Sequence, residues 1–177
     1  MKKTIKRNAA IRLFQTIGAM ALGHLDEKTL EAVMANFNAF RSVMDDFDKL
    51  KKELSDRLYK DVDKEVHQKF FEVVAKFEAE TDMEKRIELN EVMKTYTDIM
   101  PLYEKHIAVI IALLNKDVEI EIEEVDADDF IKGVVLGKKD APIHEIRGIF
   151  APIFKEEKKE DKTDFSELDE LLKDLKD

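Results

Sequence analysis

The sequence predicts a mainly α-helical protein, and three observations support that prediction. Five glycines and three prolines are all that 177 residues contain, so turns are few and elements are long. Charged residues make up 40% of the chain, against about a quarter in an average protein. Apolar residues recur at alternating steps of four and three from Val33 to Leu58, the spacing of a long helix with one buried face. We therefore expect an antiparallel long-helix hairpin or bundle, a small β element near residues 117–125, and a flexible acidic C-terminal tail that ends in an amphipathic helix.

The first two helices have clear boundaries in the sequence. Apolar residues at helical spacing predict a helix over residues 8–20, and Gly23 ends it. Asp26 is a suitable N-cap for the next helix. That second helix carries the long apolar seam, which Lys51 alone interrupts, and we expect it to run to about Leu58.

The expected partner of the long helix is the segment that follows it. Residues 62–77 carry another apolar stripe at helical spacing, and residues 59–63 can form the turn between the two. A seam of this length suits antiparallel pairing in the near-parallel geometry of coiled coils. We predict that these two helices form the long hairpin.

Two more helices are expected before the β element. Thr81 followed by Glu84 forms a capping box, so a helix starts at about Asp82. Pro101 either kinks a continuous helix or lies in the first turn of a new one. Residues 102–114 are apolar along nearly one whole side, so we expect this helix to lie centrally.

The most unusual stretch is DVEIEIEEVDADDF, residues 117–130, which holds eight carboxylates and no cation. Val118, Ile120 and Ile122 alternate with glutamates, and this period of two predicts a strand with one buried and one solvated face. A lone strand needs a partner. The candidates are residues 133–136, Thr4 with Ile5, or another molecule.

The C-terminal part divides into a helix, a linker and a second helix. Asp140 followed by Pro142 is a helix start, and this helix should end at about Phe150. Residues 155–164 are nearly all charged and should form a flexible linker. Residues 165–177 carry an amphipathic stripe that we expect to be ordered only when docked. Its members are Phe165, Leu168, Leu171, Leu172 and Leu175. The predicted organisation is a helical domain over residues 1–154, this linker, and the C-terminal helix.

The chain contains no recognisable catalytic pattern, so we expect no enzyme, no cofactor and no metal site. Cysteine is absent, and there is no glycine-flanked serine and no glycine-rich phosphate loop. The four histidines are scattered and are expected at the surface or at helix ends. The acidic loop from Asp126 resembles the start of a calcium loop, but Ile131 and Gly137 stand where such a loop needs glycine and glutamate. We predict that these carboxylates form a solvated face with a helix N-cap.

The charge distribution bears on partners and location. A net charge of −10 disfavours phosphate backbones and anionic membranes. The cations that gather at the N-terminus are not accompanied by a recognition motif, so nucleic acid is not a favoured partner. They are Lys2, Lys3, Lys6, Arg7 and Arg12. No apolar stretch approaches the roughly 18 residues of a membrane span, and no signal-peptide pattern is present. We expect a cytoplasmic protein.

Four segments, taken in order, carry a family resemblance: LGHLDEKTLE, KLKKELSDRLY, ALLNKDVEIEIEEV and DAPIHEIRGIF. Over about residues 8–150 the chain resembles a small family of bacteriophage proteins of unknown function, usually encoded near tail and lysis genes. The resemblance implies a host-cell cytoplasmic or virion-associated setting. The family has no assigned activity, so the resemblance implies no site residues.

We expect a non-enzymatic, phage-type accessory protein that acts by contact with another protein or with a second copy of itself. The candidate contact residues are Val118, Ile120 and Ile122 of the strand, and Phe165, Leu168, Leu171, Leu172 and Leu175 of the C-terminal helix. One alternative is an acidic inhibitor that mimics a nucleic-acid backbone in the basic cleft of a host or defence enzyme. Another is that the N-terminal cations contact nucleic acid while the helical hairpin dimerises.

Overall fold

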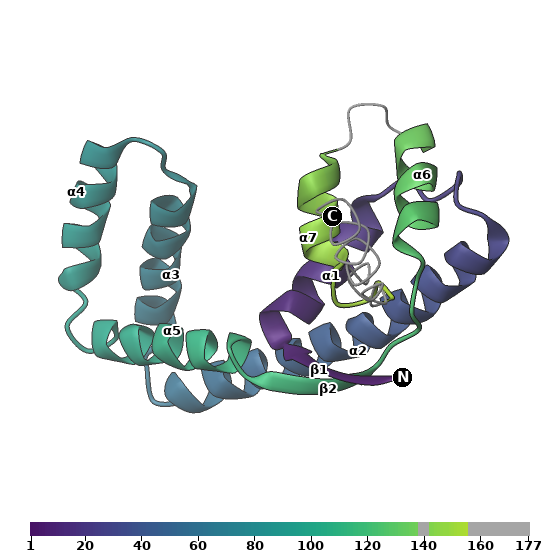
Figure 1. Cartoon of the computed structure of the whole chain (residues 1–177). Helices are drawn as coiled ribbons and strands as arrows, with labels where there is room; N and C mark the ends of the chain where they lie inside the picture. The colour runs from purple at the N-terminus through teal and green to yellow at the C-terminus, as the bar shows by residue number, and fades with distance from the viewer. Residues whose placement is uncertain (138–141, 156–177) are drawn as a thin grey trace, which may run out of the picture.

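The computed structural model describes residues 1–137 and 142–155, and it is mainly α-helical, as the sequence predicts (Figure 1). The elements in chain order are β1 (Lys2–Lys6), α1 (Arg7–Ala19), α2 (Glu27–Leu58), α3 (Lys64–Ala79), α4 (Met83–Lys94), α5 (Met100–Leu114), β2 (Asp117–Glu121), α6 (Ala127–Gly137) and α7 (Ile143–Phe150). The predicted linker and C-terminal helix, with Phe165, Leu168, Leu171, Leu172 and Leu175, lie outside the described residues. None of the described helices is long and apolar enough to cross a membrane.

Helix α2 is the central element of the structure, and α1 lies antiparallel to the first half of α2 (Figure 1). Asp26 caps α2 as predicted, because its Oδ1 accepts a hydrogen bond from the backbone N–H of Thr29 at 3.0 Å. The α1–α2 contact is held by apolar side chains, among them Phe14 and Phe37, whose rings stack with centroids 4.8 Å apart. The two N-terminal helices thus match the sequence prediction.

The predicted long hairpin between α2 and residues 62–77 is wrong. Helix α3 leaves the line of α2 and pairs with α4 instead (Figure 1). Asp63 starts α3 afresh, since its side chain accepts from the N–H groups of Glu65 and Val66 at 2.9 and 3.1 Å. The seam of α2 is covered by α1, β2 and α5. A helical seam specifies which face is buried, but several elements together can bury it.

The path from α4 to α5 resolves the alternatives at Pro101. Asp82, rather than Thr81, caps α4 by accepting from the N–H groups of Glu84 and Lys85. Pro101 lies in the first turn of a new helix, α5, where a missing N–H costs nothing.

The predicted central position of α5 is wrong, because not one of its side chains is fully buried although the structure describes them all. It packs against neighbours on one side and is open on the other.

The β element pairs with the N-terminus. Strand β2 is antiparallel to β1, so Thr4 and Ile5 are the partner among the three candidates. Residues 133–136 instead belong to α6, a helix whose N-cap is predicted from the sequence but whose extent is not. A Cβ at Gly133 would lie 2.5 Å from Leu25 Cδ2, so glycine permits the close approach of α6 to the loop before α2.

Two apolar clusters form the interior of the described structure. The proximal cluster joins α1, the first half of α2, β2, α6 and α7, and fully buried Phe40, Phe130 and Phe150 lie in it. The distal cluster is smaller. Its buried members are Tyr59, Phe70, Val74, Met93 and Ile99. We call residues 59–114, which surround this cluster, the distal lobe (Figure 1).

Candidate functional site

The acidic strand is charge-matched to the basic N-terminus. In the antiparallel register Lys2 lies opposite Glu121, Thr4 opposite Glu119 and Lys6 opposite Asp117. The amine of Lys6 lies 2.8 Å from Asp117, and that of Lys2 lies 2.8 Å from Glu119, its diagonal neighbour. Cross-strand pairs of opposite charge favour pairing. The basic N-terminus and the acidic strand, which are far apart in the sequence, therefore form one two-stranded ribbon.

A buried asparagine fixes the end of β2 to α2. The Asn36 side chain is 1% exposed. Its Nδ2 donates to the Glu123 carbonyl at 2.7 Å, and its Oδ1 accepts from the Glu123 N–H at 2.8 Å. This amide therefore satisfies the backbone of Glu123 in the way a neighbouring strand would. Asn36 is not among the residues predicted from the sequence, although an Asn within an apolar seam is a signal that indicates it.

A groove runs between β2 and α2, with a volume of about 440 Å³. Ala39 and Val43 of α2 are half-buried in it, and Ser42 and Asp46 of α2 are exposed along it. Its remaining lining residues are Arg7, Val118, Glu119, Ile120 and Glu121. The groove is thus bounded on one side by a strand.

Arg7 connects this groove to α5. Its Nη1 donates to the Leu113 carbonyl at 3.1 Å, where a cation also complements the negative end of the α5 dipole. Its Nε is buried and has no hydrogen-bond partner in the part of the chain that the structure describes. A buried donor without an acceptor is costly.

The strand residues predicted to bind a partner point inward. Ile122 is fully buried, Ile120 is 7% exposed, and Val118 is half-buried against the proximal cluster. Their side chains therefore pack the core. Strand β2 leaves two things open: its acidic side chains and the backbone edge that β1 does not occupy.

The acidic loop after β2 caps a helix. Asp126 accepts from the N–H groups of Asp128 and Asp129 at 3.1 and 3.2 Å, which confirms the predicted N-cap. Asp128 pairs with Arg147 of α7 at 2.8 Å. Within residues 1–137 and 142–155, no group of three or more His, Asp and Glu side chains converges in a way that would hold a metal ion.

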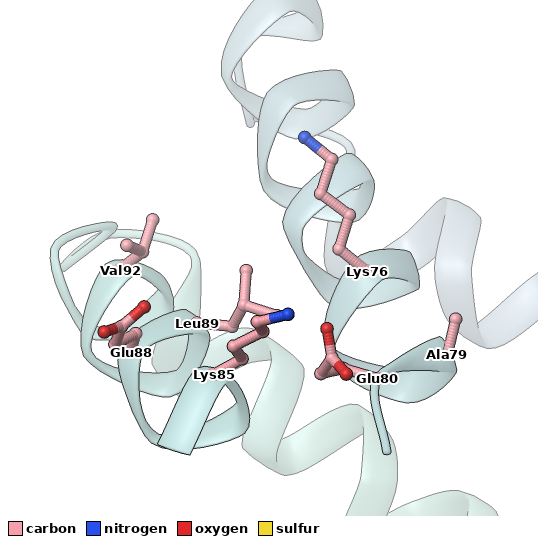
Figure 2. Close-up of a pocket in the computed structure, with 7 residues that line it drawn as sticks. All are labelled: Lys76, Ala79, Glu80, Lys85, Glu88, Leu89 and Val92. Carbon is pink, nitrogen blue, oxygen red and sulfur yellow. The ribbon is translucent and has the colours of Figure 1, made fainter. Parts of the chain in front are cut away.

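A second opening lies in the distal lobe, between the end of α3 and α4, with a volume of about 500 Å³ (Figure 2). Figure 2 shows Lys85 and Leu89 on the side of α4 that faces α3. The lining residues are Lys76, Ala79, Glu80, Lys85, Glu88, Leu89 and Val92. The lining thus mixes charged with apolar side chains.

Apolar side chains also remain exposed on other faces of the distal lobe. On α4, Met83 and Ile87 are 72% and 57% exposed, and by helical periodicity they lie on the flank away from Leu89 and Val92. On α5, Ile111 is 53% exposed. Helix α4 thus has apolar residues on two flanks, of which α3 covers only part.

A hydrogen-bonded tyrosine–histidine pair lies where α2, α3 and α5 meet. The Tyr59 hydroxyl and His106 Nδ1 are 3.1 Å apart, and the His67 ring packs against Tyr59 with centroids 5.1 Å apart. Burial raises the pKa of Tyr59 to about 12, and the neighbouring Tyr103 adds to the rise. Burial also lowers the pKa of His106. Both shifts favour the neutral forms, so near pH 7 the pair acts as a structural hydrogen bond.

These contacts bring together His67 and His106, which are 39 positions apart in the sequence and were expected to be scattered.

Comparison with known proteins returned no match to a family model, a curated protein or a solved structure. The geometry of the chain itself therefore carries the functional argument.

Proposed function

We propose that the protein is a non-enzymatic, phage-type accessory protein that acts through protein–protein contacts. The observation that supports this best is the apolar surface of the distal lobe. Helix α5 is rich in isoleucine and leucine, yet none of its side chains is fully buried, and α4 exposes Met83 and Ile87. Exposed apolar patches on soluble proteins mark interaction sites more often than scattered apolar residues do.

The composition of the distal cluster agrees with this proposal. Among the residues that the structure describes, five buried side chains support a lobe of three helices, whereas the proximal cluster contains sixteen. Small cores stabilise weakly, because the area removed from water is small relative to the chain that is ordered. A partner that covers α4 and α5 would complete the burial.

Site-specific photo-cross-linking tests the proposal. A photoreactive residue replaces Ile111 on α5, and a matched variant carries it at Arg41, an exposed position on α2. In extract from the source cells, the proposal predicts one discrete cross-linked protein, or a cross-linked dimer of this chain, from position 111 and none from position 41. Equal cross-linking from both positions, or none from either, would contradict it.

The alternative, an acidic mimic of a nucleic-acid backbone, receives less support. Asp117, Glu119 and Glu124 lie within ion-pair distance of Lys6, Lys2 and Lys3 of the same chain. These lysines offset part of the negative charge that such a mimic needs, and the same pairs engage the cations that would contact nucleic acid. Loss of partner binding in high salt would favour the mimic, while salt-insensitive binding favours apolar contact.

A further inference from the structure

The two-stranded sheet leaves one edge of β2 open. Met1 and Ile122 exchange two backbone hydrogen bonds of 2.7 Å, which makes them a hydrogen-bonded pair. Such pairs recur at every second residue of an antiparallel ladder, so Lys3–Ile120 and Ile5–Val118, two and four residues further along, also face each other through hydrogen bonds. The backbone groups of the residues between them on β2 point to the opposite edge. These are Asp117, Glu119 and Glu121, and their N–H groups have no partner within the described residues.

This open edge borders the groove along α2 described above. Ala39 and Val43 give the groove an apolar floor, and Ser42 lies exposed beside them. An added strand takes its affinity from backbone hydrogen bonds and its specificity from the side chains it meets at alternate positions. The groove and the edge together supply both kinds of contact.

The charges beside the edge decide what can occupy it. Asp117, Glu119 and Glu121 project from the same solvated face, and Asp46 lies across the groove. A second copy of β2 would place carboxylates against carboxylates, which opposes pairing. A strand with a cation at every second residue would form ion pairs instead. β1 does this in part on the inner edge, where Lys2 and Lys6 lie 2.8 Å from carboxylates and Thr4 stands between them.

We propose that the outer edge of β2 binds an extended basic segment of a partner protein, with Lys or Arg at alternate positions, as a third strand of the sheet. The inference rests on the proposed function only in requiring a protein partner, because its surface is distinct from α4 and α5. It also accounts for the acidic row, which excludes self-pairing and selects a basic strand.

A peptide titration followed by NMR tests the proposal. The probe is a blocked peptide in which lysine alternates with threonine and isoleucine. Two control peptides carry the same residues with the lysines adjacent, or with a central proline that removes a backbone donor. Binding of the alternating peptide should slow amide exchange at Asp117, Glu119 and Glu121, and the two controls should bind about tenfold more weakly or less.

Two variants on α2 separate the groove from general charge. Ser42→Lys adds a cation inside the groove, and Asn38→Lys adds the same charge at an exposed position outside it. Ser42→Lys should weaken peptide binding about tenfold, while Asn38→Lys should change it less than about threefold. Equal effects of the two variants, equal binding of the proline peptide, or no slowed exchange along β2 would overturn the proposal. None of these results bears on cross-linking from position 111, so the two proposals fail separately.

Discussion

Asn36 shows how one side chain can fix the position of a strand. Its amide makes two hydrogen bonds with the backbone of Glu123 from within the apolar face of α2. A leucine of similar size would leave the Glu123 N–H and carbonyl without these partners. Because the amide group itself is buried, few alternative partners are available to the pair.

Asn36→Leu is therefore expected to lower the free energy of unfolding by about 1–3 kcal/mol, the cost of leaving such groups unsatisfied. Urea denaturation followed by circular dichroism measures the change. The matched control is Asn38→Leu, two positions along the same helix but exposed, which should change stability by less than about 0.5 kcal/mol. A loss of similar size in both variants would show that the bonds to Glu123 contribute little.

Tyr59 gives the structure a specific response to alkaline pH. Its folded-state pKa is about 12, whereas a tyrosine in an unfolded chain titrates near 10. As the pH rises from about 10 to about 12, the unfolded state loses the phenolic proton first, so the free energy of unfolding falls over this range. Tyr59→Phe should flatten that fall. Thermal unfolding at several pH values between 9 and 12 tests this, and an unchanged slope in the variant would contradict it.

At the scale of elements, the pairing of β1 with β2 depends on complementary charge as well as on the apolar residues beneath. Lys6 and Asp117 lie directly opposite and 2.8 Å apart, and each is more than half exposed. Exposed pairs of this kind contribute about 0.2–1 kcal/mol. Their effect is therefore measurable but small.

A charge swap isolates this contribution. Lys6→Asp alone should destabilise the protein by about 0.5–1 kcal/mol, because two carboxylates then face each other. Adding Asp117→Lys to it should recover most of the loss, and 1 M salt should shrink the difference between the single and double variants. A double variant as unstable as the single one would show that the charges do not guide the pairing.

Most elements could be predicted from the sequence because their signals are local. The caps at Asp26 and Asp126 and the alternation from Val118 to Ile122 depend on neighbours a few residues away. Which elements pack against one another, by contrast, depends on residues that are distant in the sequence. The seam of α2 suits any apolar partner, so its sequence does not distinguish α3 from the combination of α1, β2 and α5.

The parts of the candidate site that the sequence did not reveal share the same cause. The open edge of β2 follows only once β1 is known to occupy the other edge. The exposure of α5 could not be read from its composition, because a helix apolar on one side is usually buried there. The Tyr59–His106 bond joins residues 47 positions apart.

At the scale of the whole molecule, the two apolar clusters share α2 but differ in size. Burial of apolar area is the main favourable contribution to folding, so the distal lobe is expected to open more readily than the proximal part. The exposed residues of α4 and α5 belong to this less stable lobe. A partner that covers them would stabilise it by binding only the folded form.

Hydrogen–deuterium exchange over the whole chain, measured on the free protein, tests this account most directly. Amides of α3 and α4 should exchange at least about tenfold faster than those in the first half of α2, since the smaller cluster protects them less. Equal protection of the two regions would mean that the distal lobe is complete without a partner, and would contradict the account.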